Sequence, residues 1–138
     1  MNATLTIVAG ATLLTIIGIE SGGAFLLAVL RRGAGFSDLQ RSFFRAGHAH
    51  AGVLVILGLT VLLLLDSAGV AEPWSWAGVG VLASAILLPA GFFLSVLGPH
   101  SERPGPLIAL VWAGATLLAV SLVVAAVAII VSGVAALA

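Results

Sequence analysis

A glutamate and three histidines are the side chains of this sequence best placed for acid–base or metal chemistry: Glu20, His48, His50 and His100. Glu20 is the only charged residue among the first 30, and it lies eleven positions before Arg31, about 16 Å along a helix axis. A carboxyl group that deep in a membrane-spanning helix is costly, so we expect it to be protonated, to face inward and to serve a function. The alternative is a structural role, in which Glu20 bonds a serine or a backbone carbonyl and holds two helices together.

The two neighbouring histidines, His48 and His50, stand among glycines and alanines in residues 45–52, RAGHAHAG. Residues two apart on a regular helix point about 200° away from each other, so the two rings cannot bind one metal ion from one helix. We therefore expect one ring to face the interior of the protein and the other to face headgroups, lipid or a partner subunit. The small residues leave room around both rings, which suits either a flat haem edge or close helix packing.

The HxH motif resembles that of subunit I of the haem-copper oxidases, in which the two histidines serve different haems on opposite faces of one helix. The likeness covers residues 45–52 and implies haem b, with axial ligands drawn from His48, His50 and, from a later connection, His100. The copper-ligating histidines of that family have no counterpart here. The whole chain is also similar to small, uncharacterised four-helix membrane proteins of high-GC bacteria, a likeness that implies no activity. The simpler interpretation of His100 is a solvated loop side chain.

The composition places these residues in a membrane. Of 138 residues, 62% are apolar and 7% are charged, the mean hydropathy is +1.31 and the net charge is zero. A soluble domain carries about 25% charged residues, so a soluble enzyme and a nucleic-acid-binding protein are excluded. Cys, Lys and Tyr are absent, which also excludes a disulfide scaffold, thiol or Schiff-base catalysis and a Walker-type phosphate loop.

Charged residues divide the sequence into four apolar stretches, each long enough to cross a hydrocarbon core of about 30 Å as a helix. No stretch alternates with period two, so a β-barrel is not expected. We predict an all-α membrane protein with one domain over residues 1–138. Its four transmembrane helices form an up-down bundle and span about 5–28, 42–66, 74–98 and 107–134. Ser37 and Gln40 have the spacing of a capping box at the start of the second helix.

The five basic residues all fall in or beside the first and third connections: Arg31, Arg32, Arg41, Arg45 and Arg103. The positive-inside rule then places these connections in the cytoplasm and both termini outside the cell (inner or plasma) membrane. We expect Arg31, Arg32, Arg41 and Arg45 to contact lipid headgroups. Aromatic belts at the two interfaces are expected at Phe43 and Phe44 and at Trp74 and Trp76.

Small residues are spaced for close helix packing in three of the predicted helices. They are Gly18 and Gly22 in the first, Gly80 and Ser84 in the third, and Ser121, Ala125, Ala128 and Ser132 in the fourth. Residues 23–26 and 91–94 share a short likeness, which would fit a weak duplication of a two-helix hairpin. A bundle this small has little lumen, so we expect a homo-oligomer or a larger membrane complex.

Three classes of function remain. The first is a non-enzymatic binding or translocation module, in which Glu20 and one of His48 and His50 bind a proton, a metal ion or a small solute. The second is a structural or assembly subunit of a larger membrane complex. The third is a haem-b redox subunit. We rank them in this order, and we place a membrane enzyme last because only Glu20 lies deep enough to contribute a catalytic polar group.

Overall fold

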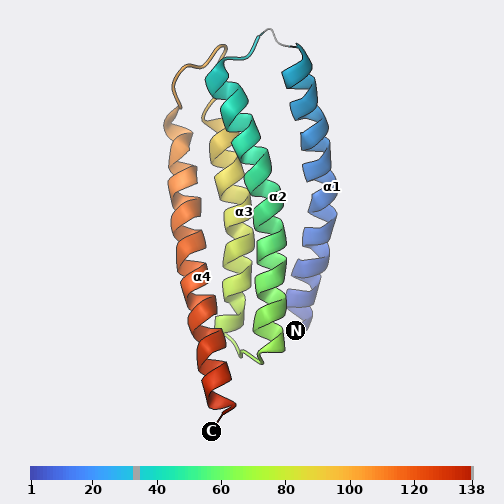
Figure 1. The fold of residues 1–138 in the computed structure, drawn as a ribbon, viewed down its shortest axis with the longest axis vertical. Helices are drawn as coiled ribbons and strands as arrows, with labels where there is room; N and C mark the ends of the chain where they lie inside the picture. Colours follow the sequence, from blue (N-terminus) through green and yellow to red (C-terminus); the bar gives the residue numbers. More distant parts are fainter. Residues whose placement is uncertain (33–34, 138) are drawn as a thin grey trace.

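The computed structural model describes residues 1–32 and 35–137, apart from the side chains of Leu30 and Arg32. All regular structure in these ranges is helical. The long helices are α1 (Ala3–Arg32), α2 (Asp38–Ser67), α3 (Ala77–Leu94) and α4 (Ala109–Ala135), and two short 3-10 helices, η1 (Trp74–Trp76) and η2 (Pro106–Ile108), precede α3 and α4. The four long helices run alternately up and down (Figure 1), and all are long and apolar enough to span a membrane. The predicted fold class is confirmed.

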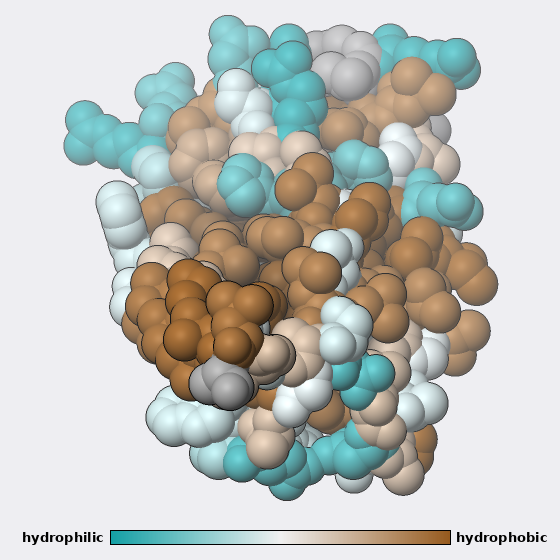
Figure 2. Space-filling model, turned by 60° about the horizontal axis from the view of Figure 1, so that its bottom comes forward, coloured by the Kyte–Doolittle hydropathy of each residue, from teal (hydrophilic) through white to brown (hydrophobic). Residues whose placement is uncertain are grey.

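The two ends of the bundle differ in charge. The α1–α2 and α3–α4 connections lie together at one end, which we call the arginine end because it carries Arg31, Arg41, Arg45 and Arg103. The α2–α3 connection and both chain termini lie at the other end, which we call the acidic end because it carries Asp66 and Glu72 (Figure 1). Between the two ends the surface is largely apolar, as the brown residues in Figure 2 show. This distribution is that of a chain whose middle faces lipid.

Helix boundaries follow local signals. Ser37 caps α2 with the capping box predicted from the sequence: its hydroxyl accepts a hydrogen bond from the Gln40 backbone, and the Gln40 side chain accepts one from the Ser37 backbone. Helix α2 therefore starts at Asp38, before the predicted span. Helix α3 ends earlier than predicted, at Leu94 rather than near residue 98. Ser95 and Val96 then form a buried turn.

Helices α2, α3 and α4 form the tightly packed part of the bundle, with α3 at its centre. Half of the most apolar window of α3 is buried. Glycines allow the close approach: a Cβ at Gly91 would lie 2.6 Å from the backbone nitrogen of Val111, and Gly80 lies against Ser121. Ser121 and Ala125 are buried, so the small-residue stripe predicted on α4 packs against α3 within the chain.

Helix α1 is the least enclosed of the four, with only 6% of its apolar window buried. Its main neighbour is α2, beside which it lies at the edge of the molecule (Figure 1). An apolar crevice of about 350 Å³ separates much of α1 from α3, and residues such as Thr12, Ile19 and Ile86 line it. The bundle is thus open on the α1 side.

Aromatic residues hold α1 to the rest of the bundle near the arginine end. The ring of Phe44 is buried and lies 6.0 Å from Phe25, 5.8 Å from Phe36 and 5.7 Å from Phe93, measured between ring centroids. The prediction that Phe44 belongs to an interfacial belt was therefore wrong. Packing of three elements around it outweighs the preference of aromatic rings for the interface. Trp74 and Trp76 at the acidic end are exposed, as a belt requires.

Candidate functional site

His48 lies between α1 and α2, against two adjacent glycines. A Cβ built on Gly23 would be 3.3 Å from both Cε1 and Nε2 of the imidazole, and one on Gly22 would be 3.6 Å from Nδ1. The ring is half-buried, and among the described residues it has no hydrogen-bond or ion-pair partner. A side chain at Gly23 would be tighter against the imidazole than an ordinary contact, whereas one at Gly22 would meet it at normal contact distance. His48 thus faces α1.

Glu20 lies on the exposed flank of α1, three residues before Gly23 and so one helical turn further from the arginine end. The expectation that Glu20 faces inward is not met within a single chain. Its carboxyl has no hydrogen-bond or ion-pair partner in residues 1–32 and 35–137. An unpartnered carboxyl at this depth in a membrane needs a polar partner or a proton, since a charge there is costly.

Glu20 lies close to the His48 contact along the axis of α1. The imidazole contacts α1 two to three residues beyond Glu20, which is about 3–5 Å along the helix axis. Side chains of a helix lean toward its N-terminus, so on the antiparallel α1 and α2 the two groups lean in opposite directions. Glu20 leans toward the acidic end and His48 toward the arginine end. Glu20 and His48 could therefore bind protons at two different depths in the membrane.

His50 occupies a different environment from His48. Its Nδ1 lies 2.7 Å from the carbonyl oxygen of Ala46, and its ring lies 5.1 Å from that of Phe92 on α3. If Nδ1 donates to this carbonyl, Nε2 carries the free lone pair, which is the usual arrangement of a metal-binding histidine. The side chain is exposed. The two rings face different surroundings, but His50 lies against Phe92 of α3 as well as being exposed, so it does not face only headgroups, lipid or a partner.

His100 does not join the other two histidines. It lies exposed in the α3–α4 connection with a backbone φ of +49°, a left-handed conformation uncommon outside glycine. In the part of the chain that the structure describes, no three His, Cys, Asp or Glu side chains lie close enough together to hold a metal ion. A second axial ligand for a haem at His50 would have to come from outside this arrangement.

The arginines differ in what they can offer a lipid headgroup. Arg41 is engaged within the chain: Nη2 donates to the Phe36 carbonyl at 2.9 Å, and Nη1 lies 3.4 Å from Asp38. Arg31 and Arg45 are exposed and remain candidates for headgroup contacts. The side chain of Arg32, also predicted to contact lipid, lies outside the described residues.

The buried side chain that fixes the arginine end is Gln40, which the sequence had indicated only as part of a helix cap. Its Nε2 donates to the carbonyls of Val96 and Gly98, both at 2.9 Å. The Ser37 hydroxyl donates to the carbonyl of Ser101. The start of α2 thereby holds the α3–α4 connection. The hydrogen bonds from Gln40 and Ser37 to the α3–α4 connection join residues far apart in the sequence, so no local pattern predicts them.

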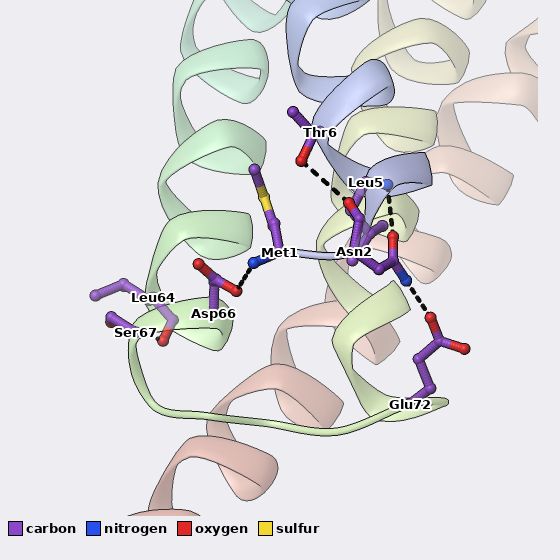
Figure 3. A network of polar contacts seen from close by, with 8 residues as sticks. All are labelled: Met1, Asn2, Leu5, Thr6, Leu64, Asp66, Ser67 and Glu72. Carbon is purple, nitrogen blue, oxygen red and sulfur yellow. Dashed lines mark hydrogen bonds and ion pairs between the residues drawn. The ribbon is translucent and has the colours of Figure 1, made fainter.

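A second polar network ties the start of α1 to the acidic end of the bundle (Figure 3). The Asn2 side chain accepts a hydrogen bond from the Leu5 backbone at 2.8 Å and donates one to Glu72, while the Met1 amino group pairs with Asp66. An asparagine just before an apolar helix is a helix-capping signal that could have predicted the first of these bonds. The network positions the start of α1.

Comparison with known proteins adds no functional assignment: no family model matches the sequence, and the comparisons with curated proteins and with solved structures find no match.

Proposed function

We propose that this chain is a non-enzymatic membrane module that binds and relays protons, with Glu20 and His48 as the proton-binding groups. The observation that carries the proposal is the contact of the His48 imidazole with Gly22 and Gly23, two and three residues along α1 from Glu20. Neither side chain has a polar partner among the described residues. Histidine exchanges protons near neutral pH, and a carboxyl in hydrocarbon is most stable when it carries a proton.

A proton suits this site better than a metal ion or a small solute. Two ligands from α1 and α2 are too few for a structural metal site, and no cluster of three is present in the described ranges. The crevice beside α1 is lined almost entirely by apolar side chains, which would not orient a polar solute. A proton needs only two exchangeable groups at suitable depth.

We further propose that the protein lies in the cell membrane with its arginine end in the cytoplasm. Arg31 and Arg45 are exposed at this end, where they would meet anionic headgroups. In this orientation His48 is the group nearer the cytoplasm, and Glu20 is the group nearer the membrane centre.

Proton flux into liposomes tests the proposal. Purified protein is reconstituted with a trapped pH-sensitive dye, and a potassium diffusion potential drives protons inward. We expect Glu20→Gln to lower the flux by about tenfold or more, because an amide cannot exchange a proton. His48→Gln should also lower it and change its dependence on pH.

Two substitutions serve as matched controls. His50→Gln alters the other histidine of the same helix, and Glu72→Gln removes an acid at the acidic end. Both should leave the flux within about twofold of the unaltered protein, since a change of that size is under 0.5 kcal/mol in barrier height. A Glu20→Gln variant with unaltered flux would rule the proposal out.

Haem binding is the second candidate function, and the geometry of His50 favours it over His48 as the ligand. A ring whose Nδ1 bonds the Ala46 carbonyl at 2.7 Å presents Nε2 outward beside Phe92. Haem would supply electron transfer, and this chain would supply one axial nitrogen. A visible absorption spectrum before and after dithionite tests this: a reduced-haem band that His50→Ala abolishes supports it, and a featureless spectrum from cells supplied with haem contradicts it.

A further inference from the structure

Glu20 lies on a regular row of exposed residues that runs along the whole of α1. Positions 3, 6, 10, 13, 17, 20, 24, 27 and 31 alternate in steps of three and four, and all are exposed. This is the spacing at which two helices pack side by side along a shared seam. We call its central part the Glu20 seam: Gly10, Leu13, Ile17, Glu20, Ala24 and Leu27.

The Glu20 seam contains a carboxyl group without a hydrogen-bond partner among the described residues. This carboxyl distinguishes the seam from the rest of α1. The hydroxyls of Thr12, Thr15 and Ser21 each bond a carbonyl of their own helix. Glu20 has no such bond among the described residues. A lipid-facing polar group without a hydrogen-bond partner is costly in an apolar medium. We therefore expect a polar group to pack against the Glu20 seam at the depth of Glu20.

We propose that a second copy of this chain covers the Glu20 seam, α1 against α1, with the two Glu20 carboxyls hydrogen-bonded to each other. Two copies inserted in the same direction can be related by a two-fold axis along the membrane normal. Such an axis brings equal depths together, so Glu20 meets Glu20. Each neutral carboxyl then donates its O–H to the carbonyl oxygen of the other, and the polar groups of both are satisfied without any third partner.

Other features of α1 suit this contact. No atom of a neighbouring helix lies within 4 Å of the position that a Cβ on Gly10 would occupy, and Gly10 and Ala24 on the seam allow the two backbones to approach closely. The neighbour of α1 within the chain is α2, and the residues of the Glu20 seam are exposed, so a second α1 can lie along the seam without displacing α2. The inference rests on the proposed function in one respect: it names the partner of the same Glu20 site.

Cysteine cross-linking in native membranes tests the dimer, because the chain contains no cysteine of its own. Ile17→Cys places a thiol on the Glu20 seam, and Leu14→Cys places one on a neighbouring row. The two parent side chains are similarly exposed, at 64% and 70%. After oxidation we expect a disulfide-linked dimer from Ile17→Cys, with a yield at least about fivefold above that from Leu14→Cys, since only same-depth residues near the axis meet.

Glu20 substitutions in the Ile17→Cys background test the carboxyl pair itself. Glu20→Leu should abolish the cross-link, and it makes α1 more apolar, so failure to insert would not explain the loss. Glu20→Gln should retain it, because two amides can also pair. Equal yields from Ile17→Cys and Leu14→Cys, an undiminished cross-link in Glu20→Leu, or cross-linking of Ile17→Cys to a different protein would each overturn the dimer.

The outcomes separate this inference from the proposed function. If the protein carries protons but Ile17→Cys forms no cross-linked dimer, the dimer is overturned and the proton relay is not. A cross-linked dimer without proton flux would overturn the proton relay alone and leave Glu20 with a structural role.

Discussion

The imidazole of His48 rests on the backbone of Gly23, with a distance of 3.3 Å from its Nε2 to the position that a Cβ would occupy. This contact joins α2 to the one helix that the rest of the bundle encloses least. It also brings a titratable ring of α2 to within a turn of Glu20 on α1.

We predict that Gly23→Val destabilises the protein. The added side chain would meet the His48 ring at less than normal contact distance, and overpacking of this kind costs about 1–3 kcal/mol in free energy of unfolding. Gly18→Val, on the same helix, is the control, because no neighbouring atom lies within 4 Å of its Cβ position. Denaturation by SDS in mixed micelles, followed by tryptophan fluorescence, measures both. Equal stability of the two variants would contradict the contact.

Gln40→Ala should loosen the arginine end. The substitution leaves the carbonyls of Val96 and Gly98 and the backbone N–H of Ser37 without their partner, and a buried group left unsatisfied costs about 1–3 kcal/mol. Hydrogen exchange of the α3–α4 connection should become faster. Asp38→Ala removes a fully exposed side chain from the same helix turn and should leave that exchange unchanged. Unchanged protection in Gln40→Ala would show that the carboxamide does not hold the connection.

Gly91→Ala should separate α3 from α4. A methyl group there would lie 2.6 Å from the backbone nitrogen of Val111, and a backbone atom cannot rotate away as a side chain can. We expect a loss of about 1–3 kcal/mol and a lower midpoint of thermal unfolding in detergent. Gly133→Ala, with no atom within 4 Å of its Cβ position, provides the comparison and should keep the original midpoint. A common midpoint for the two would argue against this helix contact.

Single cysteines report which end of the bundle faces the cytoplasm. Glu102→Cys places a thiol in the exposed α3–α4 connection, and Ala71→Cys places one in the exposed α2–α3 connection. We expect a membrane-impermeant maleimide added to intact cells to label Ala71→Cys and not Glu102→Cys. Opening the cells should make both reactive. The reverse pattern would invert the proposed orientation.

Features set by local sequence could be predicted. The four spans follow from the length of uncharged sequence between charges, and the start of α2 follows from Ser37 and Gln40 three residues apart. The opposite facing of His48 and His50 follows from the angle between residues two apart on a helix. Each of these depends on residues within one or two turns of each other.

Features set by which helices meet could not be predicted. The buried position of Phe44 depends on Phe93, 49 positions later, and the role of Gln40 depends on a carbonyl at Val96. The cost of an acidic group facing lipid predicts that Glu20 faces inward. The structure is open on the α1 side, so a residue on the flank of α1 remains exposed in the single chain. Sequence periodicity gives the faces of a helix but not its neighbours.

The central place of α3 has a consequence for how the protein is made. The glycines Gly80 and Gly91 of α3 pack against α4, which is the last of the four helices to be synthesised. Until α4 enters the bilayer, this face of α3 meets lipid tails that cannot approach its backbone as closely as Ser121 and Val111 do. The bundle therefore gains its α3–α4 contact only after α4 has entered the bilayer, and α1, α2 and α3 insert without it.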